Sequence, residues 1–482
     1  MILSSPWVIP ISGPPIADGA IAIEGEQIVA VGPKPLVYQH YPQFPPIEFP
    51  ACVLMPGFVN VHSHLELSIL RGYLEDLTFW KWIRELTRIK YEVLSYDDLV
   101  VSAFLGAFEA VRAGITTVAD PMDVGGTLQA VLGTGIRGLV YQEVFSPKAD
   151  EAEAMIHKLD NQLRLCRSRI DEFPGNSAYH RFFKEGLNRD EKSMEAGKKR
   201  LRLGVSPHAP YTVSAPLFRA AHRYAKDAGL AVCIHAGESA AEWEFLQQGT
   251  GVIADSYQAR QIPWLPPHTT PLNYLHNLGV VDENTLLVHC IHLEAGDFNL
   301  LETQNAAVAH CPKSNSKLGH GYMNLREVYG RKIRLGLGTD SVASNNAMDM
   351  FEEMRFARGN PSMMEGQNGT FNLSTPLSAE SLLRMATLGG AETLGMSKEI
   401  GSLEVGKAAD IIAVDLSGLH VQPVFSPVDA LVYSCRAPDV RMTMVAGEIL
   451  FHEEERKHIY SDAFSERVET IRRKMLHARR ES

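Results

Sequence analysis

The stretch that decides the fold is Pro56-Gly57-Phe58-Val59-Asn60-Val61-His62-Ser63-His64. The run Val53–Val61 is mostly apolar and partly β-branched, so it predicts a buried strand that leads into His62. Residues i and i+2 of a strand point to the same side, so His62 and His64 present two imidazoles in parallel. Such a pair can begin a site for a borderline metal such as zinc, although the spacing alone also occurs without a metal.

Strand-like runs alternate with helical stretches through the middle of the chain. Eight strands that alternate with helices predict an α/β protein, a (β/α)8 TIM barrel rather than an open sheet. In such a barrel, catalytic groups lie at the C-terminal ends of the strands. The expected strands are Val53–Val61, Thr116–Ala119, Gly138–Gln142, Leu203–Val205, Ala231–His235, Thr285–His289, Ala306–His310 and Arg334–Gly338.

Both ends of the chain carry short β-rich runs followed by turn residues. We therefore predict a small β-sandwich domain formed from residues 1–55 and 400–455, around a hydrolase barrel of residues 56–399. Residues 456–482 should form a C-terminal helix, because an apolar stripe at helical spacing suits docking on the barrel. That stripe is Phe464, Val468, Ile471 and Met475.

Two insertions interrupt the barrel pattern. Residues 171–199 are polar and lack periodicity, so we expect a loop on the face opposite the chemistry. Residues 239–275 follow a strand, which places them on the active face, where Trp243 and Trp264 could form a wall over the substrate.

Composition excludes several classes of function. The 482 residues are 45% hydrophobic and 21% charged, which is typical of soluble globular proteins. The net charge of −11 argues against a nucleic-acid partner. We expect no membrane span and no secretion signal, because no long apolar run is present and the start lacks a basic region. Six scattered cysteines without a CxxC pair fit a reducing cytoplasm.

Polar groups stand at the ends of three further predicted strands. His235 would supply a third imidazole, and Glu238 could reach a water on the metal as a proton carrier, although a lone His-x-x-Glu also fits a surface turn. His289 ends another strand. Asp340 ends the last one, where an aspartate can also serve as a helix N-cap. Three histidines and one aspartate would bind one divalent cation with room for water.

Taken together, these segments resemble the amidohydrolase superfamily, in particular its mononuclear metal-dependent deaminase branch. This branch includes methylthioadenosine/S-adenosylhomocysteine, aminodeoxyfutalosine and guanine deaminases and chlorohydrolase-like proteins. The resemblance covers about residues 1–455. The ordered motifs that carry it are Pro56–His64, Ser206–Tyr211, His235–Ser239, Val288–Leu293, His310–Asn315, Gly338–Asn346 and Gly401–Ile411.

The resemblance implies a role for each motif. Glu238 would be the proton shuttle, His289 would assist it without binding the metal, Asp340 would orient the attacking water, and His208 would contact substrate. The strand before Ser206 offers no lysine to bridge two ions, so one ion is expected, Zn²⁺ or Fe²⁺. Its ligands would be His62, His64, His235 and Asp340.

The implied substrate is a small heterocycle, most closely an adenosine-derived nucleoside. Related deaminases carry Pro-x-Glu after an Asp-Leu-x-x-x-x-Trp segment, and that glutamate holds the ribose hydroxyls. Here the segment ending at Trp82 is followed by Arg88 and Glu92 without the proline. Glu92 would serve if shifted by one, and Trp82 and Arg88 are further candidate contacts, although Arg88 also fits a solvated helix face.

Two alternatives remain open. One is a chlorohydrolase or another amidohydrolase that acts on a triazine or on a purine or pyrimidine base. Glu238 favours deamination, because a departing halide needs no proton. The other is a non-catalytic scaffold relative, against which the full ligand set argues. Barrels of this kind often pair, so a homodimer is a further expectation.

Overall fold

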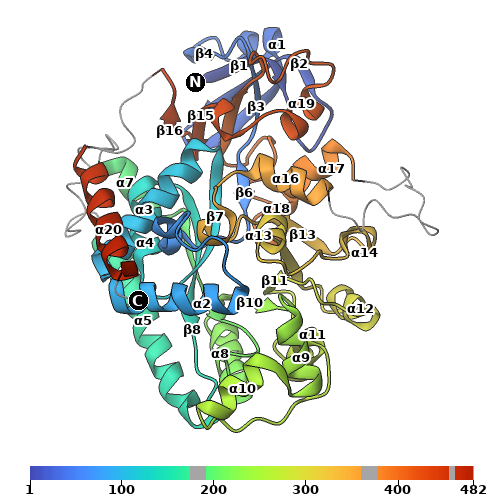
Figure 1. Cartoon of the computed structure of the whole chain (residues 1–482). Helices are drawn as coiled ribbons and strands as arrows, with labels where there is room; N and C mark the ends of the chain where they lie inside the picture. The colour runs from blue at the N-terminus through green and yellow to red at the C-terminus, as the bar shows by residue number, and fades with distance from the viewer. Residues whose placement is uncertain (174–190, 360–376, 455–461, 481–482) are drawn as a thin grey trace.

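Eight parallel strands form a barrel at the centre of the molecule (Figure 1). The computed structural model describes residues 1–173, 191–359, 377–454 and 462–480. The barrel closes where the Val61 N–H donates to the Leu337 carbonyl at 3.1 Å. The predicted (β/α)8 barrel is confirmed. Its strands, in hydrogen-bonded order, are β6 (Phe58–Asn60), β7 (Ile115–Met122), β8 (Arg137–Val144), β9 (Leu201–Pro207), β10 (Ala231–Ala236), β11 (Thr285–His289), β12 (Ala307–His310) and β13 (Arg334–Leu337).

The first predicted strand is in fact two strands in different sheets. β5 (Cys52–Pro56) pairs with the strands of the chain ends, and only β6 enters the barrel. Gly57 separates them, and a Cβ atom there would lie 2.0 Å from the Thr116 Cγ2 atom. The prediction of one continuous strand over Val53–Val61 was wrong, because an apolar run cannot reveal a change of sheet at a glycine.

Strands from the two chain ends share a second sheet, shown at the top of Figure 1 in blue and red. Its order is β16-β15-β14-β5-β1-β2-β3, with β4 beside β1. Apolar side chains from both halves, including Ile21 and Met442, meet in one cluster. The two ends therefore fold together. The strands are β1 (Ile2–Val8), β2 (Ile16–Glu24), β3 (Gln27–Pro33), β4 (Pro46–Glu48), β14 (Ile411–Asp415), β15 (Val440–Val445) and β16 (Glu448–His452).

Helices cover the outside of the barrel, and α1 (Lys34–His40) and α19 (Pro427–Tyr433) accompany the end sheet. The remaining covering helices are α3 (Tyr96–Arg112), α4 (Gly126–Thr134), η3 (Ala149–Glu151), α5 (Ala152–Glu172), α7 (Glu191–Lys198), α8 (Ala215–Asp227), α12 (Ala295–Thr303), α14 (Leu325–Gly330), α16 (Met350–Arg358), α17 (Ala379–Met385), α18 (Leu388–Thr393) and η5 (Ala437–Asp439).

The two insertions differ from each other. In the first, α7 forms where a loop was expected and buries Met194, while residues 174–190 lie outside the described part. The second forms α9 (Ala240–Gln248), α10 (Gly251–Ala259) and α11 (Pro271–Asn277). There Trp264 stacks on Phe245 with ring centroids 4.2 Å apart, so this tryptophan packs against its own insertion.

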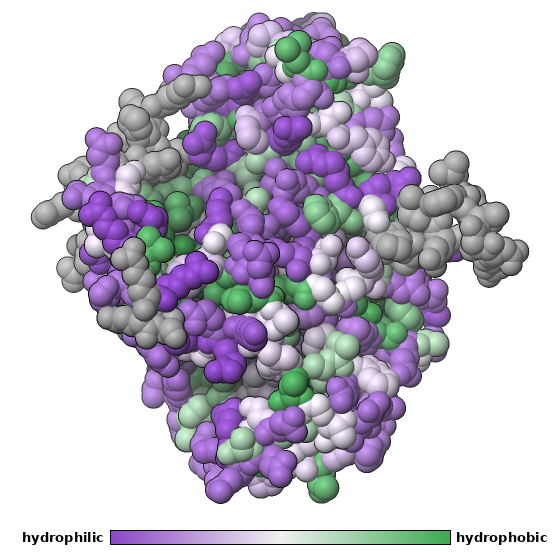
Figure 2. Space-filling model, in the orientation of Figure 1, coloured by the Kyte–Doolittle hydropathy of each residue, from purple (hydrophilic) through white to green (hydrophobic). Residues whose placement is uncertain are grey.

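The C-terminal tail forms α20 (Asp462–Arg480), which packs against α3. Phe464 meets Phe108 edge-on at 5.3 Å, and Lys474 Nζ lies 2.7 Å from Asp98 Oδ2. In the face shown in Figure 2, apolar residues form small patches separated by hydrophilic ones. Among the described helices, none has the length and apolar character needed to cross a bilayer.

Candidate metal centre

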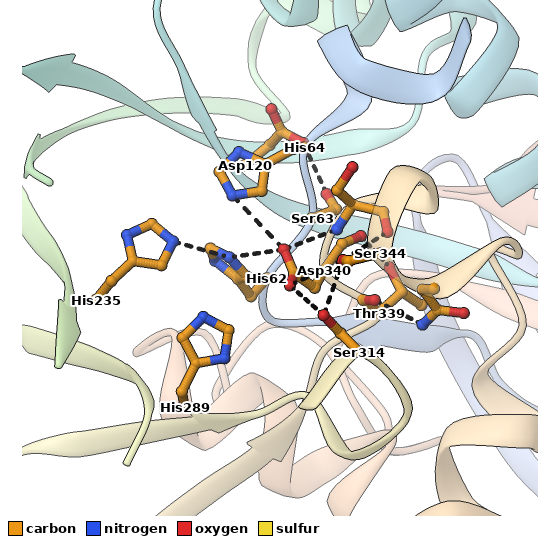
Figure 3. A network of polar contacts seen from close by, with 12 residues as sticks. His62, Ser63, His64, Asp120, His235, His289, Ser314, Thr339, Asp340 and Ser344 are labelled. Atoms are coloured by element: carbon orange, nitrogen blue, oxygen red, sulfur yellow. Dashed lines mark hydrogen bonds and ion pairs between the residues drawn. The ribbon is translucent and has the colours of Figure 1, made fainter. Parts of the chain in front are cut away.

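Four histidines converge at the C-terminal ends of the barrel strands (Figure 3). His62 and His64 follow β6, His235 lies in β10, and His289 ends β11. His62 Nε2 lies 3.2 Å from His235 Nε2. Ligand atoms of His62, His235 and His289 lie within 4.8 Å of one another, and so do those of His62, His64 and Asp340. The structure therefore brings the predicted ligand set together.

Asp340 follows β13, the neighbour of β6 where the barrel closes, and its N–H donates to the His62 carbonyl at 2.9 Å. Its Oδ1 atom lies 3.6 Å from His62 Nε2 and 3.7 Å from His64 Nε2. Its Oδ2 atom accepts hydrogen bonds from Ser314 Oγ at 2.5 Å and from Ser344 Oγ at 3.2 Å. These hydroxyl groups fix the carboxylate so that Oδ1 faces the imidazoles.

The backbone at this point is closely packed and strained. A Cβ atom at Gly338 would lie 2.9 Å from the Cβ of His62, so only glycine lets the last strand approach the first so closely. His289 and Asp340 have φ angles of 73° and 57°, in the left-handed region that most side chains avoid. Such strain is concentrated at functional sites, where the surrounding structure maintains it.

Hydrogen bonds assign the proton on two of the imidazoles. His235 Nδ1 lies 3.1 Å from the His208 carbonyl oxygen, and His289 Nδ1 lies 2.9 Å from Asn315 Oδ1. Since both acceptors are oxygens without a proton, each Nδ1–H donates. The lone pair on each Nε2 is then directed into the cluster, as in histidines that bind metals.

The charges in this cluster fit a divalent cation. Burial lowers the pKa of His64 to about 3 and the pKa of His235 well below its usual value, so these imidazoles are neutral. Burial opposes ionisation of Asp340, but the hydrogen bond and charge of His62 hold its pKa well below the usual range. His62 Nε2 faces His235 Nε2 at 3.2 Å, and a cation bound between them would accept a lone pair from each. This donor set suits Zn²⁺ or Fe²⁺.

Glu238 lies beside this cluster, at the turn after β10. The Glu242 carboxylate accepts from the Glu238 N–H at 2.9 Å and from the Gly237 N–H at 3.2 Å, which fixes this turn. Glu238 Oε1 lies 3.6 Å from His289 Nε2. Burial would raise the pKa of Glu238, but His289 and His320 lower it to about 2. The carboxylate is therefore ionised and able to accept a proton.

The predicted substrate contacts fall into two groups. The His208 ring lies 4.7 Å from the His235 ring, and the buried Trp82 stacks on Phe79 beside the site. Arg88 instead donates to Glu85 of its own helix at 2.8 and 2.7 Å, and Glu92 is exposed. These two side chains are not brought to the cluster.

Four neighbouring residues were not identified from the sequence. Ser314 and Asn315 stand in the His310–Asn315 motif, which carried the resemblance without roles for them. His320 lies 3.5 Å from Glu238 Oε1, and its only sequence signal is a histidine between two glycines. Lys90 is 8% exposed and lies 3.5 Å from Asp123 Oδ2; the helical pattern around it gives no sign of its burial.

Comparisons with known proteins identify the family and support the fold. A family model described as "Amidohydrolase family" matches residues 53–450. The chain is 32% identical over 438 residues to the 5-methylthioadenosine/S-adenosylhomocysteine deaminase of Nitratidesulfovibrio vulgaris strain Hildenborough, covering 90% of this chain and 88% of that protein. The chain therefore belongs to the amidohydrolase family. Its fourth barrel strand, β9, contains no lysine.

Two solved structures share the whole architecture. One is an adenosine deaminase from Xanthomonas campestris with bound zinc, at a TM-score of 0.77 and 28% identity, covering 99% of this chain and 98% of that one. The other is an atrazine chlorohydrolase from Arthrobacter aurescens TC1 complexed with zinc. It has a TM-score of 0.76 and 22% identity, covering 98% of this chain and 99% of that one. At 22% identity, the second likeness supports the fold alone.

Proposed function

We propose that this protein is a metal-dependent hydrolytic deaminase that releases ammonia from an adenosine-derived nucleoside of the methylthioadenosine or S-adenosylhomocysteine type. The observation that carries the proposal is the position of Glu238, an ionised carboxylate beside neutral clustered imidazoles. The relative at 32% identity bears the name of this activity. We also propose zinc as the metal, because the solved adenosine deaminase at 28% identity contains it.

His62, His64, His235 and Asp340 would hold the metal. When bound, it would supply a Lewis acid that brings the pKa of a water molecule close to neutrality. Ser314 and Ser344 hold Asp340 Oδ2 and the Ser341 N–H holds Oδ1, whose remaining lone pair would accept a hydrogen bond from the attacking water and orient it. The chain's own groups thus fix where the water stands.

Glu238 moves the protons. It accepts one from the attacking water and returns it to the ring nitrogen beside the carbon that carries the amino group. His289 stabilises the charge that develops on the ring, and Asn315 fixes its orientation. Glu238 then carries the remaining hydroxyl proton to the amino group, the C–N bond breaks, ammonia leaves, and the oxygen of water stays on the ring carbon as a carbonyl.

We further propose a cytoplasmic location. The six cysteines are all free and buried, which fits a reducing compartment.

The test is a release assay on zinc-loaded protein. Ammonia is measured with methylthioadenosine, S-adenosylhomocysteine and adenosine, and chloride is measured with a chloro-triazine. We expect ammonia from at least one nucleoside, and a loss of about 10²–10⁴-fold in Glu238→Gln, which should keep its zinc. Faster release of chloride than of ammonia would favour the chlorohydrolase alternative, and full turnover by Glu238→Gln would overturn the role of Glu238.

A further inference from the structure

A second imidazole lies against the proton-carrying carboxylate. His320 stands in the turn after α13 (Pro312–Lys317), where its N–H donates to the Asn315 carbonyl at 3.0 Å. This turn directs its Nε2 atom to within 3.5 Å of Glu238 Oε1. Since the side chain is only 8% exposed, the contact is shielded from water.

Both imidazoles approach the same carboxylate oxygen. His289 Nε2 lies 3.6 Å from Oε1, so His289 and His320 flank this one atom. Within the described residues, His320 Nε2 has no partner at full hydrogen-bonding geometry, and Glu238 Oε1 is its close acceptor. A buried nitrogen without a completed hydrogen bond is costly, so it indicates a contact that tightens in another state of the site.

The other side of His320 meets the helix that covers the barrel mouth. Phe79, the first residue of α2 (Phe79–Arg88), contacts the His320 ring edge-on at 4.5 Å and 82°. Phe79 also stacks on Trp82 at 6.3 Å and 14°. His320 therefore links the reacting carboxylate to the aromatic wall that α2 places beside the site.

We propose that His320 is a further positioning residue for the reaction, with its Nε2–H donating to Glu238 Oε1 when substrate fills the site. Oε1 is then held by the His320 N–H, and Oε2 is the oxygen that exchanges protons with water and with the ring nitrogen. This inference rests on the proposed deaminase function. It requires no change in His320 itself, whose proton stays on Nε2 throughout the cycle.

Three variants separate positioning from packing. His320→Phe keeps a flat ring against Phe79 and removes the nitrogen, whereas His320→Gln restores a donor. His222→Phe is the matched control, because His222 on α8 makes a similar pair with Asp282 Oδ2 at 3.0 Å, away from the site. All are compared as zinc-loaded full-length protein with methylthioadenosine as the probe.

We expect His320→Phe to lower kcat about 10- to 100-fold and to change KM less than about threefold. The loss in kcat is smaller than the whole contribution of general acid–base catalysis, because Glu238 itself is kept. His320→Gln should recover at least half of that loss on a logarithmic scale. Zinc content and Tm should match those of the His222→Phe control. An unchanged kcat in His320→Phe, or no recovery in His320→Gln, would overturn the proposal.

A second readout does not depend on turnover. Crystal structures of zinc-loaded wild type and His320→Phe should show the Glu238 carboxylate rotated away from His289 in the variant. If wild type releases no ammonia from any nucleoside, the proposed function fails, and this structural comparison still decides the role of His320. A carboxylate in the same position in both crystals would contradict it.

Discussion

The barrel contains two buried groups of charged and polar residues, one at each end, and they are built in opposite ways. At the N-terminal end, Arg137 begins β8 and donates to both oxygens of Asp410, at 2.9 and 3.0 Å. The Ala446 N–H adds a third bond to Asp410 at 2.7 Å. Both carboxylate oxygens of Asp410 are therefore paired with donors.

At the C-terminal end, several buried polar atoms lack a hydrogen-bond partner among the described residues. His62 and His235 point nitrogen atoms at each other, His62 Nδ1 has no partner among the described residues, and His289 and Asp340 have strained backbone. A satisfied buried pair holds the barrel to the end sheet, whereas an unsatisfied cluster needs a ligand to be stable. The two groups thus differ in whether their buried polar atoms have hydrogen-bond partners, and this difference distinguishes the structural site from the functional one.

Removing one ligand should give the largest effect. In His235→Asn, turnover should fall on the order of 10³-fold or more, because the metal is no longer held to supply its chemistry. Elemental analysis should show the zinc content falling with it. Full zinc occupancy and unchanged turnover would place the metal elsewhere.

Breaking the structural pair should instead affect stability alone. Arg137→Met leaves the Asp410 carboxylate buried without its partner, which should cost about 3–5 kcal/mol in the free energy of unfolding. The double variant Arg137→Met/Asp410→Leu should recover most of that loss, since it removes the stranded charge as well. Denaturant unfolding measures both, and kcat per folded molecule should not change. A lower kcat would mean that the two ends of the barrel are coupled.

Removing the Ser314 hydroxyl should weaken metal binding without abolishing it. In Ser314→Ala, Asp340 loses its 2.5 Å hydrogen bond, and zinc affinity should fall about 10- to 100-fold, as for other residues that orient ligands. Competition with a chelator measures this affinity. Ser168→Ala is the control, because Ser168 donates to Glu172 at 2.7 Å on the surface of α5. Equal affinities in the two variants would show that Ser314 does not orient Asp340.

Acid should affect the metal-free protein through the buried imidazoles. Burial lowers the pKa of His64 to about 3 and of His208 to about 4, from an ordinary value of 6.5. The unfolded chain therefore binds more protons below pH 6.5, so the stabilising contribution is full above that pH and is lost as pH falls toward 3–4. Below pH 6.5, each such histidine should lower the free energy of unfolding by up to about 1.4 kcal/mol per pH unit.

His64→Asn provides the test of this pH dependence. Between pH 6.5 and 4, the free energy of unfolding of its metal-free form should fall less steeply than that of wild type. The difference in slope should correspond to close to one fewer proton bound on unfolding, as followed by thermal unfolding. Identical slopes in the two proteins would mean that His64 is not buried as a neutral imidazole.

Sequence patterns predicted the barrel because each strand is a short apolar run that ends in a polar residue, as at Leu335–Leu337 before Asp340. They also placed the candidate ligands at strand ends, which a closed barrel brings together, and these side chains do cluster. They missed the break at Gly57, where the change of sheet depends on contact with Thr116, far along the chain.

The directions of side chains on irregular segments could not be predicted from the sequence. Lys90 is buried and Glu92 exposed because α2 continues into a π-helical turn over Ile89–Val93, which rotates the residues after Arg88 out of α-helical register. His320 lies in a turn whose course is fixed by tertiary contacts, so no periodicity could place it beside Glu238. The directions of these side chains therefore depend on tertiary structure, whereas His62, His64, His235 and Asp340 stand at strand ends that a barrel brings together.

The most direct test of the central claim is the metal itself. Elemental analysis of purified protein, combined with anomalous scattering from its crystals, should find one zinc ion per chain, bound by His62, His64, His235 and Asp340. A metal-free protein that still turns over substrate, a second ion in the barrel, or an ion bound by other side chains would contradict the account.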